Sequence, residues 1–308
     1  MYENFFNLVF SPFQIMPDPR FYFDSSGHSR ALAHLTYGLA QGDGFIVITG
    51  EVGAGKTTLI DHLLTQLDPR RYVAARIVTS QLSPTGLLRM ILRAFDIDGH
   101  TGDKAEMLCR FDAFGREKRA AGVRVLLIVD EVQNLPFATL EELRMLSNLG
   151  TGGGGSLQTC LIGQPQFLRT IQSPRAEQLR QRISTSYHLG VLQEGEVGEY
   201  IQHRLRIASW SGDPSFDDDV FPAVYACTGG VPRRINLLCS RLLLWSYLND
   251  AHRISHADVS EVAEEWLSEP GNRSVDAVQV PAAGATPAPR MAQRLKVIER
   301  KIVRHAGQ

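Results

Sequence analysis

The sequence has no excess of charge of either sign. Among its 308 residues, 32 lysines and arginines face 33 aspartates and glutamates, so the formal net charge is −1. A chain so balanced has no overall field that would attract DNA or an anionic membrane, and only local patches could do so. A nucleic-acid partner is therefore not expected.

Cysteine is scarce, and no apolar run is long enough to span a membrane. The four cysteines, at 109, 160, 227 and 239, show no close pairing, which predicts buried free thiols in a reducing compartment. The longest apolar candidate, residues 237–248, is interrupted by Arg241 and falls short of the roughly 20 residues that a span needs. The first residues show neither the basic start nor the cleavage site of a signal peptide. These absences predict a cytoplasmic protein.

Aromatic residues are concentrated in the first 24 residues. Phenylalanines and tyrosines stand at 2, 5, 6, 10, 13, 21, 22 and 23, and prolines at 12, 17 and 19 prevent a long helix. We interpret residues 1–24 as an arm that straps its aromatic side chains against the surface of the domain. An arm that binds a partner protein is the alternative.

Apolar strand patterns alternate with helical patterns as far as residue 191. We predict helices at 26–41, 56–67, 84–96, 103–121 and 137–149. The strands between them are predicted at 44–49, 72–79, 124–129, 157–162 and 186–191. Short apolar strands joined by helical crossovers are typical of an α/β domain. Residues 25–191 are therefore predicted to form a parallel five-stranded sheet with helices on both faces.

Beyond residue 191 the strand patterns stop. Helical patterns at 194–209, 217–227, 232–248 and 255–267 predict a small all-helical domain over 192–268. Residues 269–290 are rich in proline, alanine and glycine and are predicted to be a flexible linker. The end of the chain, 291–308, is predicted to be a short basic amphipathic helix, too short to be stable alone.

The segment "GEVGAGKT" at 50–57 matches the pattern G-x-x-x-x-G-K-[ST] between a predicted strand and a predicted helix. Its glycines allow backbone N–H groups to turn around the phosphates of a nucleotide, at the positive end of a helix. Lys56 would bridge the outer phosphates, and the Thr57 hydroxyl would ligate magnesium. A glycine turn with an incidental lysine is the alternative. The predicted nucleotide contacts are Gly50, Glu51, Val52, Gly53, Ala54, Gly55, Lys56, Thr57 and Thr58.

A second motif, "VLLIVDE" at 125–131, consists of the apolar end of the third predicted strand and the two acidic residues that follow it. Asp130 would emerge at the carboxyl end of that strand, where α/β sheets present their ligands, and would hold magnesium through a water molecule. Glu131 follows directly, and its carboxylate could polarise a water in line with the γ-phosphate. Two exposed acids at a strand end are the alternative. With the lysine motif, the pair predicts a nucleotide hydrolase.

Taken together, "GEVGAGKTT", "LLIVDE", "LIGQP", "LRQRI" and "GGVPRRIN" resemble the AAA+ ATPases. The N-terminal "MYENFFNLVFSPFQIMPDPRFYF" is more specifically similar to the general secretion pathway protein A family, above all to its relatives in exosortase and exopolysaccharide systems. The resemblance covers residues 1 to about 268. It implies a P-loop NTPase fold with a helical lid, and ATP and Mg²⁺ as cofactors.

The resemblance also implies roles for three further residues. Gln164, in "GQP", falls at the sensor-1 position and would orient the attacking water, although a plain turn residue fits equally well. Arg182 falls where these proteins keep an arginine finger, which reaches the nucleotide of a neighbouring subunit, and Arg180 stays an alternative for that role. Arg233 matches the sensor-2 arginine of the lid, which contacts phosphate within its own subunit; a surface arginine at a helix start is the alternative.

The resemblance implies an ATPase that works as a homo-oligomer and rearranges an unidentified component of a secretion or exopolysaccharide-export system. The basic tail offers peripheral attachment at the inner face of the membrane. Proteins of the general secretion pathway protein A type carry a membrane span and a peptidoglycan-binding module, and neither pattern occurs here, so peptidoglycan binding is not carried over. A DNA-transposition helper ATPase is the alternative. The near-neutral charge and the lack of an added helix-turn-helix module argue against it.

Overall fold

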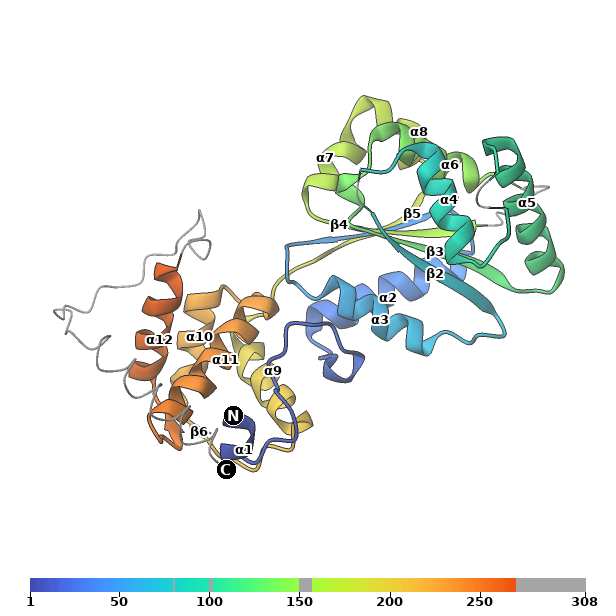
Figure 1. Ribbon diagram of the computed structural model, residues 1–308. Helices are drawn as coiled ribbons and strands as arrows, with labels where there is room; N and C mark the ends of the chain where they lie inside the picture. The colour runs from blue at the N-terminus through green and yellow to red at the C-terminus, as the bar shows by residue number, and fades with distance from the viewer. Residues whose placement is uncertain (80, 100–101, 150–156, 270–308) are drawn as a thin grey trace. The chain divides into compact units, whose positions relative to one another are not determined.

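The computed structural model describes residues 1–79, 81–99, 102–149 and 157–269 (Figure 1). The predicted tail at 291–308, and the predicted linker apart from Glu269, lie outside these residues. The chain divides into two compact units, which we describe separately. An α/β unit contains Met16–Leu192 with Val231–Arg233, and a helical unit contains Met1–Ile15, Gln193–Gly230 and residues from Arg234 onward. The predicted arm at 1–24 is thus shared between the two units.

The α/β unit is built on one parallel sheet of five strands in the order β2-β3-β4-β1-β5. Each strand except β5 lies within one or two residues of its predicted position. The strands are β1 (Phe45–Gly50), β2 (Tyr72–Val78), β3 (Arg124–Asp130), β4 (Leu157–Gly163) and β5 (Ile183–Leu189). Because β1 pairs with both β4 and β5, it lies inside the sheet and all of its residues are buried.

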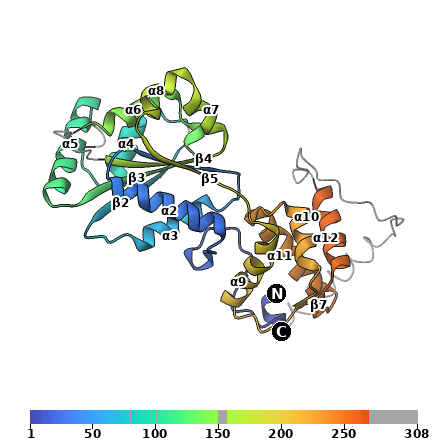
Figure 2. The same cartoon turned by 180° about the vertical axis from the view of Figure 1, so that it is seen from behind.

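Helices cover both faces of this sheet (Figures 1 and 2). On β1, Phe45 and Val47 pack into one apolar core, and Ile46 and Ile48 pack into the other. This alternation is what a strand buried on both faces requires. The first core takes side chains from α4 (Pro84–Ala94), α5 (Lys104–Ala120), α6 (Phe137–Leu146), α7 (Gln166–Gln172) and α8 (Glu177–Arg180). The second core takes them from α2 (Ser26–Gln41) and α3 (Lys56–Gln66).

Two features of the α/β unit differ from the sequence predictions. Strand β5 begins at Ile183, three residues before its predicted start; the sequence did not show this start because Ser184, Thr185 and Ser186 interrupt the apolar pattern. Helices α7 and α8 were not predicted, since both are shorter than the windows in which helical periodicity is visible. Two thiols also differ from the prediction of buried cysteines: Cys109 on α5 is exposed and Cys227 is half-buried, whereas Cys160 and Cys239 are buried.

The helical unit contains α9 (Glu194–Ile207), α10 (Val220–Thr228), α12 (His256–Ser268) and, apart from its first two residues, α11 (Pro232–Leu248). It is not purely helical, because β6 (Ser215–Phe216) pairs in parallel with β7 (Arg253–Ile254). Two-residue strands leave no alternating pattern in a sequence, so this pair was not predicted. Among the described residues, none of the helices is both long and apolar enough to cross a membrane.

The first fifteen residues belong to the helical unit and bury some of their side chains in it. Apart from the short α1 (Tyr2–Phe5) they are irregular, and their one proline, Pro12, is incompatible with a helix interior. Phe6 and Phe13 are fully or almost fully buried, at 0% and 2% exposure. The buried guanidinium of Arg204 on α9 donates to the backbone carbonyls of Pro12 and Gln14, at 2.7 and 3.1 Å. This burial favours the interpretation of the segment as a strap.

Candidate functional site

The glycine-rich segment 50–55 turns from the end of β1 into the start of α3. Gly53 and Gly55 have φ angles of +85° and +97°, a region that side chains with a Cβ rarely adopt. At Gly55 a Cβ would also lie 2.7 Å from Nε2 of His28. The turn therefore requires glycine at these positions, and its backbone forms a cradle in front of the α3 N-terminus, which is the geometry of a phosphate-binding loop.

Lys56 begins α3 and folds back over the cradle. Its Nζ donates to the carbonyl oxygens of Gly50 and Glu51, at 2.6 and 2.8 Å. The side chain is buried, and this burial lowers the pKa of Lys56, while the nearby carboxylates of Glu131 and Asp130 act in the opposite direction. A cation is thus held at the mouth of α3, where an anionic ligand would meet it.

The other predicted nucleotide contacts lie along the same turn. Ala54 is fully buried, while Val52 at the tip is 55% exposed. Thr57 and Thr58 follow Lys56 in the first turn of α3. The loop therefore combines a buried inner face with an exposed outer edge.

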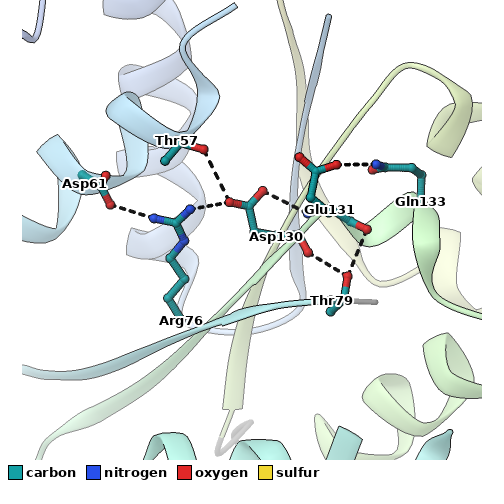
Figure 3. Close-up of polar contacts among 7 residues, drawn as sticks. All are labelled: Thr57, Asp61, Arg76, Thr79, Asp130, Glu131 and Gln133. Atoms are coloured by element: carbon teal, nitrogen blue, oxygen red, sulfur yellow. Dashed lines mark hydrogen bonds and ion pairs between the residues drawn. The ribbon is translucent and has the colours of Figure 1, made fainter. Parts of the chain in front are cut away.

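Asp130 ends β3 beside the loop and is 4% exposed (Figure 3). Its Oδ1 accepts the backbone N–H of Glu131 at 2.9 Å. Its Oδ2 lies 3.5 Å from the Thr57 hydroxyl. The two side chains that the sequence predicts as magnesium contacts are therefore brought together.

An arginine that the sequence did not predict also contacts Asp130. Arg76, on β2, donates to the same Oδ2 at 2.5 Å and to Oδ1 of Asp61 on α3 at 2.9 Å (Figure 3). Along β2 it alternates with the buried Ala75 and Ile77, so it points to the opposite face of the sheet, toward α3. Asp130 thus has a permanent positive neighbour.

Glu131 is held in an unusual backbone conformation. Its φ and ψ are +55° and +38°, the left-handed region that residues other than glycine seldom occupy. The buried Thr79 hydroxyl lies 2.7 Å from the carbonyl oxygen of Asp130 and 2.9 Å from that of Glu131, and donates to them (Figure 3). The backbone on both sides of the Glu131 Cα is therefore fixed by the side chain of the residue that directly follows β2.

Two amide side chains contact the Glu131 carboxylate. Gln133 donates to Oε2 at 2.5 Å, from the short helix η2 (Val132–Asn134). Gln164, just after β4, donates to the same oxygen at 3.3 Å. The structure thus places Gln164, the predicted sensor-1 residue, against Glu131.

The predicted arginines occupy other places. Arg182 directly precedes β5, and its carbonyl accepts the N–H of Phe45, so it lies at the amino ends of the strands, away from Lys56. Its guanidinium donates to the Ser147 hydroxyl at 2.9 Å. Arg180 is exposed and donates to the carbonyl of Ile171 at 3.0 Å. Within one chain, neither arginine joins the site.

Arg233 groups with the α/β unit and lies beside the loop. Its backbone N–H donates to the Gly53 carbonyl at 3.2 Å. A Cβ at Gly53 would lie 2.5 Å from the Cβ of Arg233, so this approach also depends on glycine. The predicted sensor-2 arginine is therefore next to the predicted phosphate cradle.

These residues fit a magnesium nucleotide. The glycine cradle and Lys56 suit a polyphosphate, and Thr57 with Asp130 suits a hydrated divalent cation. Within the part of the chain that the structure describes, no group of three or more histidine, cysteine, aspartate or glutamate side chains could hold a metal ion. A metal at this site would therefore take its remaining ligands from phosphate and water, as Mg²⁺ commonly does.

Comparison with known proteins agrees with this geometry. Residues 39–171 match the family model of the AAA domain. The chain carries an AAA domain. Its sequence is 39% identical over 268 residues to general secretion pathway protein A of Aeromonas hydrophila, and this alignment covers 86% of the chain and 48% of the relative. The chain is thus related to that protein and spans about half of its length.

Solved structures share the fold of this AAA protein at low sequence identity. The RuvB Holliday junction branch migration motor of Thermotoga maritima has a TM-score of 0.56 at 18% identity, covering 83% of this chain and 74% of its own. The Cdc6p protein of Pyrobaculum aerophilum has a TM-score of 0.60 at 15% identity, covering 81% and 71%. The ORC2 protein of Aeropyrum pernix has a TM-score of 0.56 at 16% identity, covering 78% and 66%. These similarities establish a P-loop NTPase fold.

Proposed function

We propose that this AAA protein binds Mg-ATP and hydrolyses it. The proposal depends on one observation: Lys56, after the loop that follows β1, lies close enough to Asp130 and Glu131, at the end of β3, for their charges to act on it. A cation for the outer phosphates, a carboxylate beside a metal-binding hydroxyl, and a second carboxylate are the groups that phosphoryl transfer to water requires.

Each side chain has a separate role in this proposal. The cradle N–H groups and Lys56 bind and orient the phosphates, while Thr57 and, through water, Asp130 hold Mg²⁺. The bound Mg²⁺ would neutralise the charge that develops on the phosphates. Glu131 accepts a proton from the attacking water, Gln164 orients that water, and Arg233 contacts phosphate within the same subunit.

Two substitutions test these assignments. Glu131→Gln keeps the size and polarity of the side chain but removes the base, so ATP binding should persist while phosphate release falls by about a hundredfold or more. Lys56→Ala should weaken ATP binding itself. Affinity for a fluorescent ATP analogue and the rate of phosphate release separate the two effects. Wild-type turnover by the Glu131→Gln variant would contradict the role of Glu131.

We further infer that hydrolysis rearranges a component of a protein-secretion or exopolysaccharide-export system, such as an exosortase system, at the inner face of the membrane. The supporting observation is the relationship to general secretion pathway protein A. The proposed attachment is through residues 291–308, which lie outside the described residues. Co-sedimentation with anionic vesicles, lost in high salt or on deletion of residues 270–308, would support attachment to lipid. Equal binding to neutral vesicles would contradict it.

The alternative of a DNA-transaction ATPase has its own supporting observation, the "GGVPRRIN" segment at 229–236. It predicts that duplex DNA stimulates phosphate release at low salt and that the stimulation falls steeply as salt rises. Phosphate release that is the same with and without DNA would favour the secretion proposal.

A further inference from the structure

The side chain of Gln133 bridges two loops of the α/β unit. Its Nε2 donates to Oε2 of Glu131 at 2.5 Å, and its Oε1 accepts the backbone N–H of Gln164 at 3.0 Å (Figure 3 shows the first contact). Glu131 follows β3 and Gln164 follows β4, so one amide connects the ends of two neighbouring strands.

The orientation of this amide is determined by its partners. A backbone N–H can only donate, so the atom that faces Gln164 must be the carbonyl oxygen of Gln133. The NH₂ group then necessarily faces Glu131, whose carboxylate can accept. The bridge would fail with the amide reversed, because both contacts would lose their donor–acceptor match.

Space for the bridge is provided by a glycine at the end of β4. A Cβ at Gly163 would lie 2.9 Å from Oε1 of Gln133 and 2.8 Å from Cγ1 of Val132. Any larger residue would therefore push against the amide. The glycine here is explained by this close approach, because its φ is not in the positive range.

All hydrogen bonds to the Glu131 carboxylate from described residues end on Oε2, which receives both Gln133 and Gln164. Two donors on one oxygen fix the rotation of the carboxylate and leave Oε1 as the oxygen that can accept a proton. Hydrogen bonds to a charged acceptor are stronger than neutral ones, so this orientation is well defined.

We propose that Gln133 is a positioning residue for Glu131, and that it couples Glu131 to Gln164. The inference rests on the proposed hydrolysis, and it deepens that proposal by naming the side chain that orients the base. Gln133 acts through Glu131 and need not touch the nucleotide. Its loss should therefore lower kcat and leave nucleotide binding unchanged.

The test compares three variants with wild type by kcat, KM for ATP and affinity for a fluorescent ATP analogue. Gln133→Leu keeps the bulk but removes the amide, and kcat should fall by about tenfold to a hundredfold with KM within about twofold. Gly163→Ala should lower kcat in the same way, because its Cβ displaces the amide. Gln158→Leu is the matched control, since its amide donates to the Gly38 carbonyl far from the site; its kcat should be that of wild type.

A second measurement does not depend on hydrolysis. The double-mutant cycle of Gln133→Leu and Glu131→Leu, read by denaturant unfolding, should show non-additive effects, because the two side chains are in contact. If the cycle is non-additive but the wild-type protein releases no phosphate from ATP, the proposed hydrolysis is contradicted and the contact between Gln133 and Glu131 still stands. Additive effects, a wild-type kcat for Gln133→Leu, or an equal loss of kcat and nucleotide affinity would overturn the role of Gln133.

Discussion

One carboxylate oxygen of Asp130 contacts two neighbouring side chains. Oδ2 is contacted by the guanidinium of Arg76 and lies 3.5 Å from the Thr57 hydroxyl, where the proposed Mg²⁺ would also be held. A positive charge so close to a carboxylate opposes the binding of a second cation, and it does so more strongly in a buried site than in water.

Replacement of Arg76 should therefore tighten the binding of Mg²⁺. In Arg76→Gln, the Mg²⁺ concentration that half-saturates binding of a fluorescent ATP analogue should fall by roughly threefold to tenfold, because a positive charge is removed. Titration at constant ionic strength measures this effect. A higher Mg²⁺ requirement would show that Arg76 serves to orient Asp130 and does not compete with the metal.

Asp61 provides the matched control, because it contacts the other side of the same guanidinium. Asp61→Asn removes a negative charge and leaves Arg76 on Asp130. The half-saturating Mg²⁺ concentration should then move in the opposite direction, upward.

Thr79 is expected to affect both stability and catalysis. Thr79→Val keeps the shape of the side chain but removes the donor to the carbonyls on either side of the strained Glu131 peptide. The free energy of unfolding should fall by about 1–3 kcal/mol, and kcat should fall as well. In Thr139→Val, which removes a buried hydroxyl donor to the Leu82 carbonyl, only stability should fall. Denaturant unfolding and phosphate release distinguish the two variants.

At the scale of the residue, sequence predicts those parts of the candidate site that lie in short continuous motifs. Lys56, Thr57 and Asp130 were predicted because each follows a strand in a recognisable order. Arg76 and Gln133 were not predicted, because their contacts depend on the register between strands and on which face of the sheet a side chain takes. The pattern "DEVQ" at 130–133 held the signal for Gln133, but it could not show that the amide turns back to Glu131.

At the scale of the element, four of the five strands were predicted closely, the edge strand β2 included, and β5 was not. Strand β1 opens with four consecutive apolar residues and begins within one residue of its predicted start. Strand β5 has polar residues in its first half and lies at the edge of the sheet, so its hydrophobic pattern is weak where the strand begins. An apolar strand start, which β1 has and β5 lacks, is what made the beginning of a strand predictable from sequence.

Helix α9 is expected to depend on the N-terminal strap through Arg204. Arg204→Ala removes a buried cation from the carbonyls of Pro12 and Gln14, so these acceptors lose their donor and the free energy of unfolding should fall by roughly 2–4 kcal/mol. Limited proteolysis should then cut the first fifteen residues more rapidly. Arg206→Ala, on the same helix, removes an exposed contact with Gln202 and should change neither result. Unchanged proteolysis in Arg204→Ala would show that the buried aromatic residues hold the strap without it.

At the scale of the whole molecule, the position of Arg182 predicts shared active sites. Because it lies at the amino ends of the strands, and Lys56 follows the carboxyl end of β1, we expect it to act on the nucleotide of a neighbouring subunit. Arg182→Ala and Glu131→Gln subunits, each inactive alone, should regain turnover when mixed, since some interfaces then pair an intact Glu131 with an intact Arg182. Specific activity should also rise with protein concentration. Concentration-independent activity without rescue would place the reaction within one chain.

Two buried thiols should report the unfolding of the two units separately. Burial raises the pKa of Cys160, in the α/β unit, to about 12, with the Asp130 charge adding to the effect, and burial also raises the pKa of Cys239, in the helical unit. At neutral pH both should react with a thiol reagent only after unfolding. In a Cys109→Ser, Cys227→Ser background, labelling at increasing denaturant should give one midpoint for each thiol. Coincident midpoints would show that the units unfold together.

The N-terminal strap, residues 1–15, also affects the order in which the parts of this protein can fold during synthesis. Phe6 and Phe13 are synthesised before the α/β unit, yet α9, the first helix of the unit in which they are buried, begins only at Glu194. During synthesis, at about 5–20 residues per second, these aromatic side chains stay uncovered for on the order of ten seconds or more, while the entire α/β unit is produced. These residues are therefore made before the α/β unit but reach their native place only after it, and until then a chaperone could recognise them.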